Sequence, residues 1–556
     1  MTPGPTAPDP ASGAPSGLPD VTTLAHMASA ILAAGLEAFP DRPGRGSEAP
    51  SAPFVPPRTP AAPAAPSAPF VPSRTPTAPA TPMGPPFVPP GDVPAPSTPY
   101  YFMGEASALR SPVVAAQRQL GGQTDGAVPE FDYYFINQQL SSGAAPAPAA
   151  SQGLDVGAVR RDFPILRERV NGHQLVWLDN AATTQKPQAV IDRLVWFYTH
   201  ENSNVHRAAH ELAARATDAL ESARAKVAGF LGAASPDNIV FVRGATEAIN
   251  LVAQSWGRQN IRAGDEIVIS HLEHHANIVP WQLLAAEKGA KLRVAPVDDT
   301  GQILLGAYRE LVNERTRLVA IAHVSNALGT IVPIREVIDI AHAAGACVLV
   351  DGAQAVAHER VNVAALDAEF YVFSGHKVFG PTGIGALYGK PEVLEGMPPW
   401  QGGGSMISDV TFERSIYQRP PARFEAGTGN IADAIGLGAA LDYLQRVGID
   451  KVSQYEHNLL TYATEHLLSV PGLRLIGTAP EKASVLSFVL AGYTPAQVGT
   501  ALNQYGIAVR AGHHCAQPIL RRFGLEATVR ASLAMYNTRA EVDQFVDVLR
   551  RLAADR

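Results

Sequence analysis

The chain has 556 residues, with 44 lysines and arginines against 51 aspartates and glutamates, and a formal net charge of −7. This length predicts two or three domains, and the mildly acidic balance excludes nucleic acid as an expected partner. The two cysteines cannot build a disulfide framework, which favours a reducing compartment. The most apolar early stretch, residues 21–36, is too short to span a membrane and lacks the basic start of a secretory signal. A soluble, cytoplasmic protein is therefore expected.

Residues 1–150 differ sharply in composition from the rest of the chain. They hold 31 of the 47 prolines and no lysine, since the first lysine is Lys186. Runs such as AAPAAPSAP and SSGAAPAPAA bury too little apolar surface to offset the entropy of ordering the chain. We therefore predict that residues 1–150 form a largely disordered tail.

Short apolar islands interrupt this tail. SAPFVPPRTP, SAPFVPSRTP and GPPFVPPGD repeat an aromatic anchor at Phe54, Phe70 and Phe87, and YYFMGEASALR and FDYYFINQQL are two further islands. Residues 20–31 have the spacing of an amphipathic helix. One interpretation is a solubilising tail that drifted into repeats. The other is a set of docking motifs on one tether, which gain avidity when a partner presents many sites.

From about residue 155 the sequence alternates β-branched runs with amphipathic segments. Six runs predict buried strands: NIVFVRG, DEIVIS, KLRVAPV, TRLVAIAHVS, CVLVDGAQ and FYVFSGHK. This alternation is typical of a mostly parallel sheet covered by helices. Ligands of such folds gather at the carboxyl ends of the strands, so polar residues there are the candidate site.

Two of these strands end in residues that indicate cofactor chemistry. Asp351 ends one strand, and Ser374, His376 and Lys377 end the next. A lone carboxylate at a strand end is ordinarily a helix cap or an ion-pair partner. A lysine that forms a Schiff base needs a shielded pocket, and an acid for a pyridinium nitrogen completes what pyridoxal phosphate requires.

Two further stretches complete such a site. VRGATEAIN offers Gly244 and Thr246 at a helix start, where backbone donors bind phosphate. SHLEHHANIVPW offers His274, an aromatic face that could stack on a cofactor ring, and His275 beside it. A zinc site is the alternative for these histidines, but adjacent histidines lack the ligand spacing of such sites.

The two cysteines have different surroundings. Cys347 lies within a predicted buried strand and is interpreted as a small core residue. Cys515 lies in RAGHHCAQ, where a metal ligand, a nucleophile and a buried residue are the alternatives. A thiolate is the reactive form of cysteine, and Arg510 with the two preceding histidines places positive or donating groups beside it.

The sequence resembles the Suf-type cysteine desulfurases, which are class-V aminotransferases of fold-type I. The resemblance covers about residues 155–556 and rests on WLDNAATTQKP, NVHRAAHELA, FVRGATEAINLVAQSWG, EHHANIVPWQ, HVSNALGT, VDGAQAV, FSGHKVFGPTGIG, GGGSMI, RFEAGTGN, YGIAVRAGHHCA and RASLAMYNT. It implies an α/β fold with a large domain at 173–435 that binds pyridoxal 5′-phosphate. Residues 155–172 and 436–556 would form a smaller α+β domain.

The resemblance also implies a role for individual residues. Lys377 would carry the cofactor as a Schiff base and move the substrate α-proton, and Cys515 would attack the substrate sulfur. The expected cofactor contacts are Asp351 at the ring nitrogen, Gln354 at the ring hydroxyl, His274 on the ring face, and Ala245, Thr246, Ser374 and His376 around the phosphate. Thr428 would reach the phosphate of the neighbouring subunit, which implies a homodimer. The expected substrate-binding residues are Arg530, Asn326, His206 and Arg510, with Arg530 clamping the carboxylate.

The implied reaction converts L-cysteine to L-alanine and leaves a persulfide on Cys515. A short cysteine loop such as RAGHHCA implies transfer to an acceptor protein, and no metal is expected. Selenocysteine lyase or another class-V enzyme is the alternative, whereas an idle scaffold is disfavoured by the complete lysine, aspartate, histidine and cysteine set. The tail resembles the cargo-loading segments of desulfurases packaged in encapsulin shells. It implies a shell-protein partner and a location inside an encapsulin nanocompartment, with a mere solubilising or other-partner tether as the alternative.

Overall fold

The computed structural model describes residues 153–205 and 210–555. The predicted tail with its docking islands, and His206, lie outside these residues. In the part of the chain that the structure describes, no helix combines the length and the apolar character that a membrane crossing requires.

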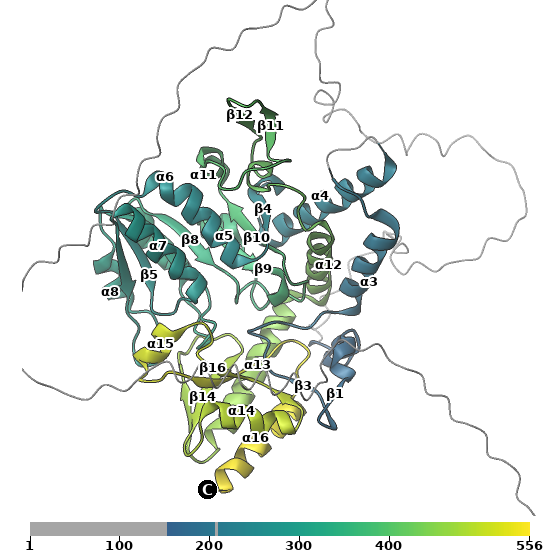
Figure 1. Ribbon diagram of the computed structural model, residues 1–556. Coiled ribbons are helices and arrows are strands. Elements are labelled where there is room, and N and C mark those ends of the chain that lie inside the picture. The colour runs from purple at the N-terminus through teal and green to yellow at the C-terminus, as the bar shows by residue number, and fades with distance from the viewer. Residues whose placement is uncertain (1–152, 206–209, 556) are drawn as a thin grey trace, which may run out of the picture. The chain divides into compact units, whose positions relative to one another are not determined.

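A seven-stranded sheet forms the centre of the larger part of the fold (Figure 1). Its order is β4 (Ile239–Val242), β10 (Gly385–Gly389), β9 (Phe370–Ser374), β8 (Cys347–Asp351), β7 (Thr316–Ala322), β5 (Glu266–Ser270) and β6 (Lys291–Ala295). The strands from β9 to β6 run parallel, and β10 is antiparallel to both its neighbours. The predicted mostly parallel sheet is thus confirmed. The expectation that all six strands are buried is wrong for β6, whose residues before Ala295 are half-buried or exposed.

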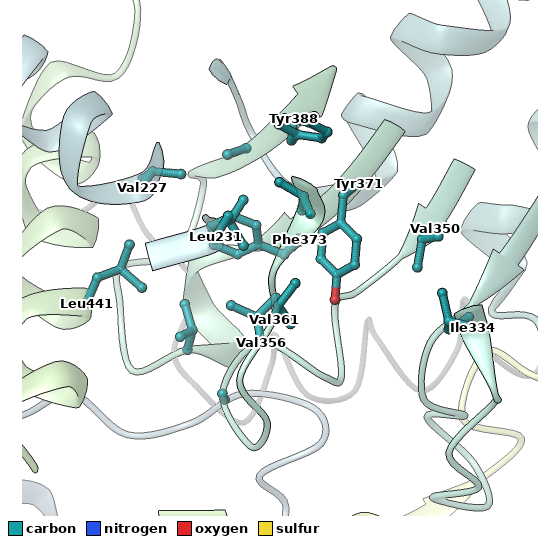
Figure 2. Close-up of a cluster of buried hydrophobic side chains, with 14 of the residues drawn as sticks. Val227, Leu231, Ile334, Val350, Val356, Val361, Tyr371, Phe373, Tyr388 and Leu441 are labelled. Carbon is teal, nitrogen blue, oxygen red and sulfur yellow. The ribbon is translucent and has the colours of Figure 1, made fainter. Parts of the chain in front are cut away.

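Both faces of the sheet are covered, which explains why its strands are almost continuously apolar. Along β8, Val348 and Val350 join one hydrophobic core while Leu349 joins the other. The first core is shared with α4 (Glu211–Leu231), α9 (Ile334–Ala343) and α12 (Ile431–Val447), as Figure 2 shows for part of it. The second core is shared with α5 (Ala245–Val252) and α7 (Val279–Lys288) on the opposite face.

A smaller antiparallel sheet has a core of its own. Its order is β13 (Leu473–Ile476), β14 (Val485–Leu490), β17 (Thr528–Ser532) and β16 (Arg510–Gly512). The helices that pack on it are α13 (Ile449–Leu468), α14 (Pro495–Gln504) and α16 (Arg539–Ala554). The predicted fold class, an α/β fold with a second smaller domain, is confirmed.

The predicted domain limits at 155, 173 and 436 stay a prediction. Helix α12 runs unbroken across residue 436 and packs on α4, and Ile449 and Val452 of the next helix still belong to the first core. A short parallel pair, β3 (Val176–Trp177) with β15 (Ile507–Ala508), ties the first described segment to the smaller sheet.

The remaining described elements are short, and most of them are connections. They are α2 (Val156–Arg161), η3 (Pro164–Arg167), β1 (Arg169–Val170), β2 (His173–Gln174), α3 (Gln188–Trp196), η4 (Phe197–Glu201), η5 (Pro236–Asn238), η6 (Ala253–Gly257), α6 (Arg258–Asn260), η7 (His275–Asn277), α8 (Leu305–Leu311), α10 (Val363–Leu366), η8 (Gly375–Lys377), α11 (Pro391–Gly396), β11 (Ile407–Val410), β12 (Ser415–Tyr417), η9 (Ala422–Phe424) and α15 (Gln517–Arg522).

Candidate active site

A cavity of about 580 Å³ lies where the carboxyl ends of β7, β8 and β9 meet the loop that follows β16. Chain segments far apart in the sequence converge on it, as expected for ligand sites in α/β folds. The predicted site residues that line it are Ala245, Thr246, His274, Asn326, Asp351, Gln354, Ser374, His376, Lys377, Arg510, Cys515 and Arg530.

One predicted residue, Thr428, does not line the cavity of this chain, because it lies in an exposed turn before α12. His206 is outside the described residues, so its place stays a prediction. Two further lining residues, Ala181 and Ala182, were not singled out from the sequence. They stand in the quoted motif WLDNAATTQKP, but an alanine side chain carries no obvious chemical signal. His513, which was expected only as a neighbour of Cys515, also lines the cavity.

Lys377 and Asp351 are the charged pair at the end of the central strands. Burial lowers the pKa of Lys377 to about 8, although Asp351 acts in the opposite direction. Burial also raises the pKa of Asp351, whose Oδ1 accepts a hydrogen bond of 3.0 Å from the Ala353 amide. A lysine with this pKa has a sizeable neutral fraction near pH 7, which Schiff-base formation requires.

The turn that carries Lys377 is fixed through the carbonyl of the preceding residue, His376. That oxygen accepts hydrogen bonds from the Thr184 amide (3.0 Å), the Thr183 and Thr184 hydroxyls (both 3.1 Å) and Lys186 Nζ (3.3 Å). The Thr184 hydroxyl in turn accepts one of 2.8 Å from the Phe379 amide. The first described segment thus positions the lysine, a contact that sequence reasoning missed.

A cradle of backbone donors opens beside this turn at the start of α5. The Ala245 amide donates a 2.9 Å hydrogen bond to Ser374 Oγ, and Thr246 is exposed toward the cavity. The backbones approach so closely that a Cβ at Gly385 would lie 2.6 Å from Gly244 Cα. A helix start with free amides and a nearby hydroxyl is suited to an anion such as a phosphate.

His376 and His274 are both neutral in this cavity. Burial, with Lys377 as the next cause, lowers the pKa of His376 to about 4 and that of His274 to about 3. His274 Nδ1 accepts a hydrogen bond of 3.0 Å from the Ala276 amide, so the neutral ring carries its proton on Nε2. Gln354 is also anchored, since its Nε2 donates to the Ala181 carbonyl at 2.6 Å.

The opposite wall is built on Asp179, which sequence reasoning missed. Its carboxylate accepts hydrogen bonds from Arg510 Nη2 at 3.0 Å and from the buried Arg530 Nη2 at 3.3 Å. Arg530 Nη1 donates to the Asn326 carbonyl at 2.8 Å. Arg530 Nε, Asn326 Oδ1 and His514 Nδ1 are buried and have no hydrogen-bond partner among the described residues. Polar atoms left in this state are costly, which indicates a polar ligand at this wall.

The loop after β16 presents Cys515 at an exposed tip. His514 and Cys515 both have φ of 54°, a left-handed conformation that is unfavourable for residues with a side chain. The loop is held by the His275 amide, which donates to the Cys515 carbonyl at 2.7 Å, and by Asn326 Nδ2, which donates to the His514 carbonyl at 2.6 Å. Cys515 is exposed, whereas Cys347 is partly buried and burial raises the pKa of its thiol well above the usual value.

His514 shapes the loop and carries no positive charge. Its Nε2 lies 2.8 Å from Thr528 Oγ1, and burial, followed by Arg530, lowers its pKa to about 3. The lowered pKa favours a role for His514 in shaping the loop over a role as a positive group. The expectation that Arg510 and the two histidines place positive or donating groups beside Cys515 stays a prediction.

Comparisons with known proteins agree with this geometry. Residues 176–545 match the aminotransferase class-V family model. The chain is 54% identical over 398 residues to the cysteine desulfurase of Dickeya dadantii, which covers 71% of this chain and 96% of that protein. The chain belongs to the cysteine desulfurase family. It is also 64% identical over 419 residues to the cysteine desulfurase of Synechococcus elongatus, which covers 74% of this chain and 67% of that longer protein.

Solved structures of this desulfurase family show the same fold. The cysteine desulfurase CsdA (S-sulfonic acid) from Escherichia coli superposes with a TM-score of 0.68 at 42% identity, over 73% of this chain and 99% of that one. The cofactor of the family is pyridoxal 5′-phosphate. The residues present fit it, because one cavity joins a lysine of lowered pKa, a buried carboxylate, a neutral histidine ring and a helix start with free amides.

Proposed function

We propose that this chain is an L-cysteine desulfurase that releases L-alanine and holds the sulfur as a persulfide on Cys515. The observation that carries the proposal is the convergence of Cys515, Lys377 and Arg530 on one cavity, although they come from different elements. The alternative, selenocysteine as the preferred substrate, uses the same residues and is decided by the experiment below.

The cofactor would be held by Lys377 through a Schiff base, by Asp351 at the ring nitrogen and by Gln354 at the ring hydroxyl. His274 would stack on the ring, and Ala245, Thr246, Ser374 and His376 would bind the phosphate. When bound, pyridoxal phosphate supplies an electron sink for bonds broken at the substrate. Arg530 would bind the substrate carboxylate with its free Nε, oriented by Asn326 and Arg510.

The chain's own residues then account for the transfer of sulfur. Neutral Lys377 accepts the substrate α-proton, which its lowered pKa favours. The Cys515 thiolate attacks the substrate sulfur, so a sulfur–sulfur bond forms and the carbon–sulfur bond breaks. The bonding electron pair stays with the β-carbon, which gains one proton and becomes the methyl group of alanine.

A single-turnover assay with Cys515→Ser tests this assignment. We expect the variant to keep the yellow cofactor absorbance and to lose more than 90% of alanine release from L-cysteine. Cys347→Ser is the matched control and should retain activity, because that thiol is partly buried in β8. Undiminished desulfuration of cysteine by Cys515→Ser would overturn the proposal, and turnover of selenocysteine alone would favour the lyase.

We further infer that the functional unit is a homodimer that passes sulfur to an acceptor protein. Val195, Trp196 and Tyr198 expose 57%, 43% and 63% of their surface on neighbouring turns of α3 and η4, which supports a subunit interface there. The exposed Thr428 would complete the partner's phosphate site. The exposed tip of Cys515 supports access by an acceptor. Sedimentation of the wild type and of a Trp196→Glu, Tyr198→Glu variant tests the dimer, which the charged variant should lose.

We also propose that residues 1–150 direct the enzyme into an encapsulin shell. The basis is the sequence alone, namely a proline- and alanine-rich segment with repeated aromatic islands. Co-expression of the shell protein with the full chain and with a chain lacking residues 1–150 tests it. Equal capture of both would show that the tail is not the address, and deletion of single islands would identify the docking motif.

A further inference from the structure

Three side chains at the mouth of the cavity form a set of metal ligands. One ligand atom each from His275, His513 and Cys515 lies within 4.8 Å of the others, and the set is half-buried to exposed. Imidazole nitrogens and a thiolate are the ligands that zinc-class cations prefer. The sequence raised His274 and His275 as a possible zinc pair. In the structure His275 belongs to this set, and the second histidine is His513.

The fold holds these ligands in place through backbone contacts that cross between the two parts of the fold. The His275 amide donates to the Cys515 carbonyl at 2.7 Å. The rings of His275 and His513 are stacked, with centroids 5.7 Å apart. Ligands that are already oriented lose less entropy when they bind an ion.

Both imidazoles turn a lone pair toward the Cys515 turn. His513 Nδ1 accepts a hydrogen bond of 3.1 Å from the Cys515 amide, just as His275 Nε2 accepts one from Gln517. A nitrogen that accepts a hydrogen bond is unprotonated and can bind a metal instead. Both hydrogen bonds lie at the long end of the usual range. When a metal occupies the two nitrogens, water can accept from the two amides instead, because the mouth of the cavity is exposed.

The distances also suit a single ion. Zinc bonds of about 2.0–2.3 Å hold three such ligand atoms roughly 3.5 Å apart. From a spread of 4.8 Å the atoms need to close by about 1 Å, which small rotations of exposed side chains provide.

We propose that His275, His513 and Cys515 bind one thiophilic divalent cation of the zinc class, with a fourth position open to water. Binding releases the Cys515 thiol proton to solvent and forms a metal–sulfur bond. The site itself does not depend on the proposed reaction. Its consequence rests on that proposed function, because a metal-bound thiolate cannot attack substrate sulfur, so the cation is a reversible inhibitor.

Metal binding by the full-length holoenzyme tests the site without reference to activity. The reduced protein is titrated with Zn²⁺, freed of excess metal and analysed for zinc, and Co²⁺ is followed by its visible d–d bands. We expect one ion per chain in the wild type and a dissociation constant raised at least tenfold in His513→Ala and His275→Gln. The glutamine can still accept the Gln517 hydrogen bond, so that variant separates ligation from loop structure.

Matched controls address ordinary thiol and histidine binding. Cys347→Ser removes the other cysteine and His173→Ala removes an exposed histidine on β2, and both should bind the ion as the wild type does. Equal affinity in the wild type, His513→Ala and His275→Gln would overturn the site. If binding follows the prediction but a chelator-reversible loss of desulfuration is absent, the proposed role of Cys515 fails and the metal site stands.

Discussion

Arg530 and Asp179 form an ion pair of 3.3 Å in which the arginine is 2% exposed. Burial lowers the pKa of Arg530 to about 10, and Asp179 acts against that loss. The same carboxylate accepts a hydrogen bond from Arg510 at 3.0 Å, so it orients two guanidinium groups at the cavity wall. Arg530 is therefore held by Asp179 and the Asn326 carbonyl, while its buried Nε has no hydrogen-bond partner among the described residues.

Asp179→Asn should weaken substrate binding more than the chemical step. The amide removes the negative charge that fixes Arg530, so we expect KM for L-cysteine to rise about fivefold or more with a smaller fall in kcat. The free energy of unfolding should fall by about 1–3 kcal/mol, because a buried charge loses its partner. Steady-state kinetics and urea unfolding measure both.

Asp299→Asn is the matched control for this variant. It removes an ion pair of similar length, 2.8 Å from Arg522, but the aspartate is 94% exposed. Exposed pairs contribute little, so neither KM nor stability should change. A fall in kcat with an unchanged KM in Asp179→Asn would contradict the positioning of Arg530 by Asp179.

Lys186→Met should disturb the cofactor through the Lys377 turn. Lys186 Nζ donates to the carbonyls of Thr184 and His376 at 2.5 and 3.3 Å, and burial lowers its pKa to about 8. Methionine fills similar space but donates no hydrogen bond, so the turn loses one of its anchors. We expect kcat to fall several-fold, an altered absorbance of the bound cofactor and a KM within about twofold of the wild type. Lys226→Met, which removes a half-exposed lysine of α4, should leave all three unchanged.

The sequence predicted most of this site because its key residues end strands. Asp351 and Lys377 follow apolar runs with the period of a buried strand, and the parallel sheet brings those ends together. The start of α5, with Gly244 and Thr246, was found for the same reason, because it follows the apolar run of β4. Cys515 stood out by rarity and by its histidine neighbours, and the family resemblance connected it to the rest.

Other contacts depend on tertiary structure that no local pattern encodes. Asp179 and Lys186 lie in the first described segment, yet they act on β17 and on the Lys377 turn. His275 meets His513 only because the smaller sheet closes over the larger one. Strand β10 was not predicted, because its GALYG run is short and has two glycines. It pairs antiparallel with β9, to which residues 375–384 join it without a crossover helix.

Glu456→Gln should remove a stabilising contribution that depends on pH. Glu456 Oε2 lies 2.6 Å from His358 Nδ1, where α13 packs on the turn after β8. Although burial alone would lower the pKa of His358, Glu456 outweighs it and raises that pKa. The folded protein therefore keeps the histidine proton at pH values where the unfolded chain has lost it. The stabilisation that this pair contributes is fully present below about pH 6.5, the usual pKa of an unfolded histidine. It is lost as the pH rises through the higher pKa of His358 in the folded protein.

The comparison is the free energy of unfolding of the wild type minus that of Glu456→Gln, by urea at several pH values. We expect a difference of about 3 kcal/mol at pH 6 that decreases toward pH 9. Asp450 lies on the same helix as Glu456 and forms an exposed ion pair with Arg360. Asp450→Asn should therefore change the free energy of unfolding little, and that change should not depend on pH in this way. A difference that grows with pH would contradict the raised pKa of His358.

Gly352→Ala should destabilise the fold and loosen the residue beside it, Asp351. An added Cβ would lie 2.1 Å from Cε1 of Tyr371, whose side chain lies among the other residues of the core in Figure 2. Its ring is fully buried in the first core, and its hydroxyl lies 3.0 Å from His323 Nδ1. Overpacking of this kind costs about 1–3 kcal/mol, so the urea midpoint should fall and less cofactor should remain after gel filtration.

Gly306→Ala, in α8 with open space around it, should be neutral or stabilising by up to about 1 kcal/mol. If Gly352→Ala and Gly306→Ala had equal stability and equal cofactor content, the turn after Asp351 could shift to accept the extra methyl group. Packing of that turn would then not hold the Asp351 carboxylate in place.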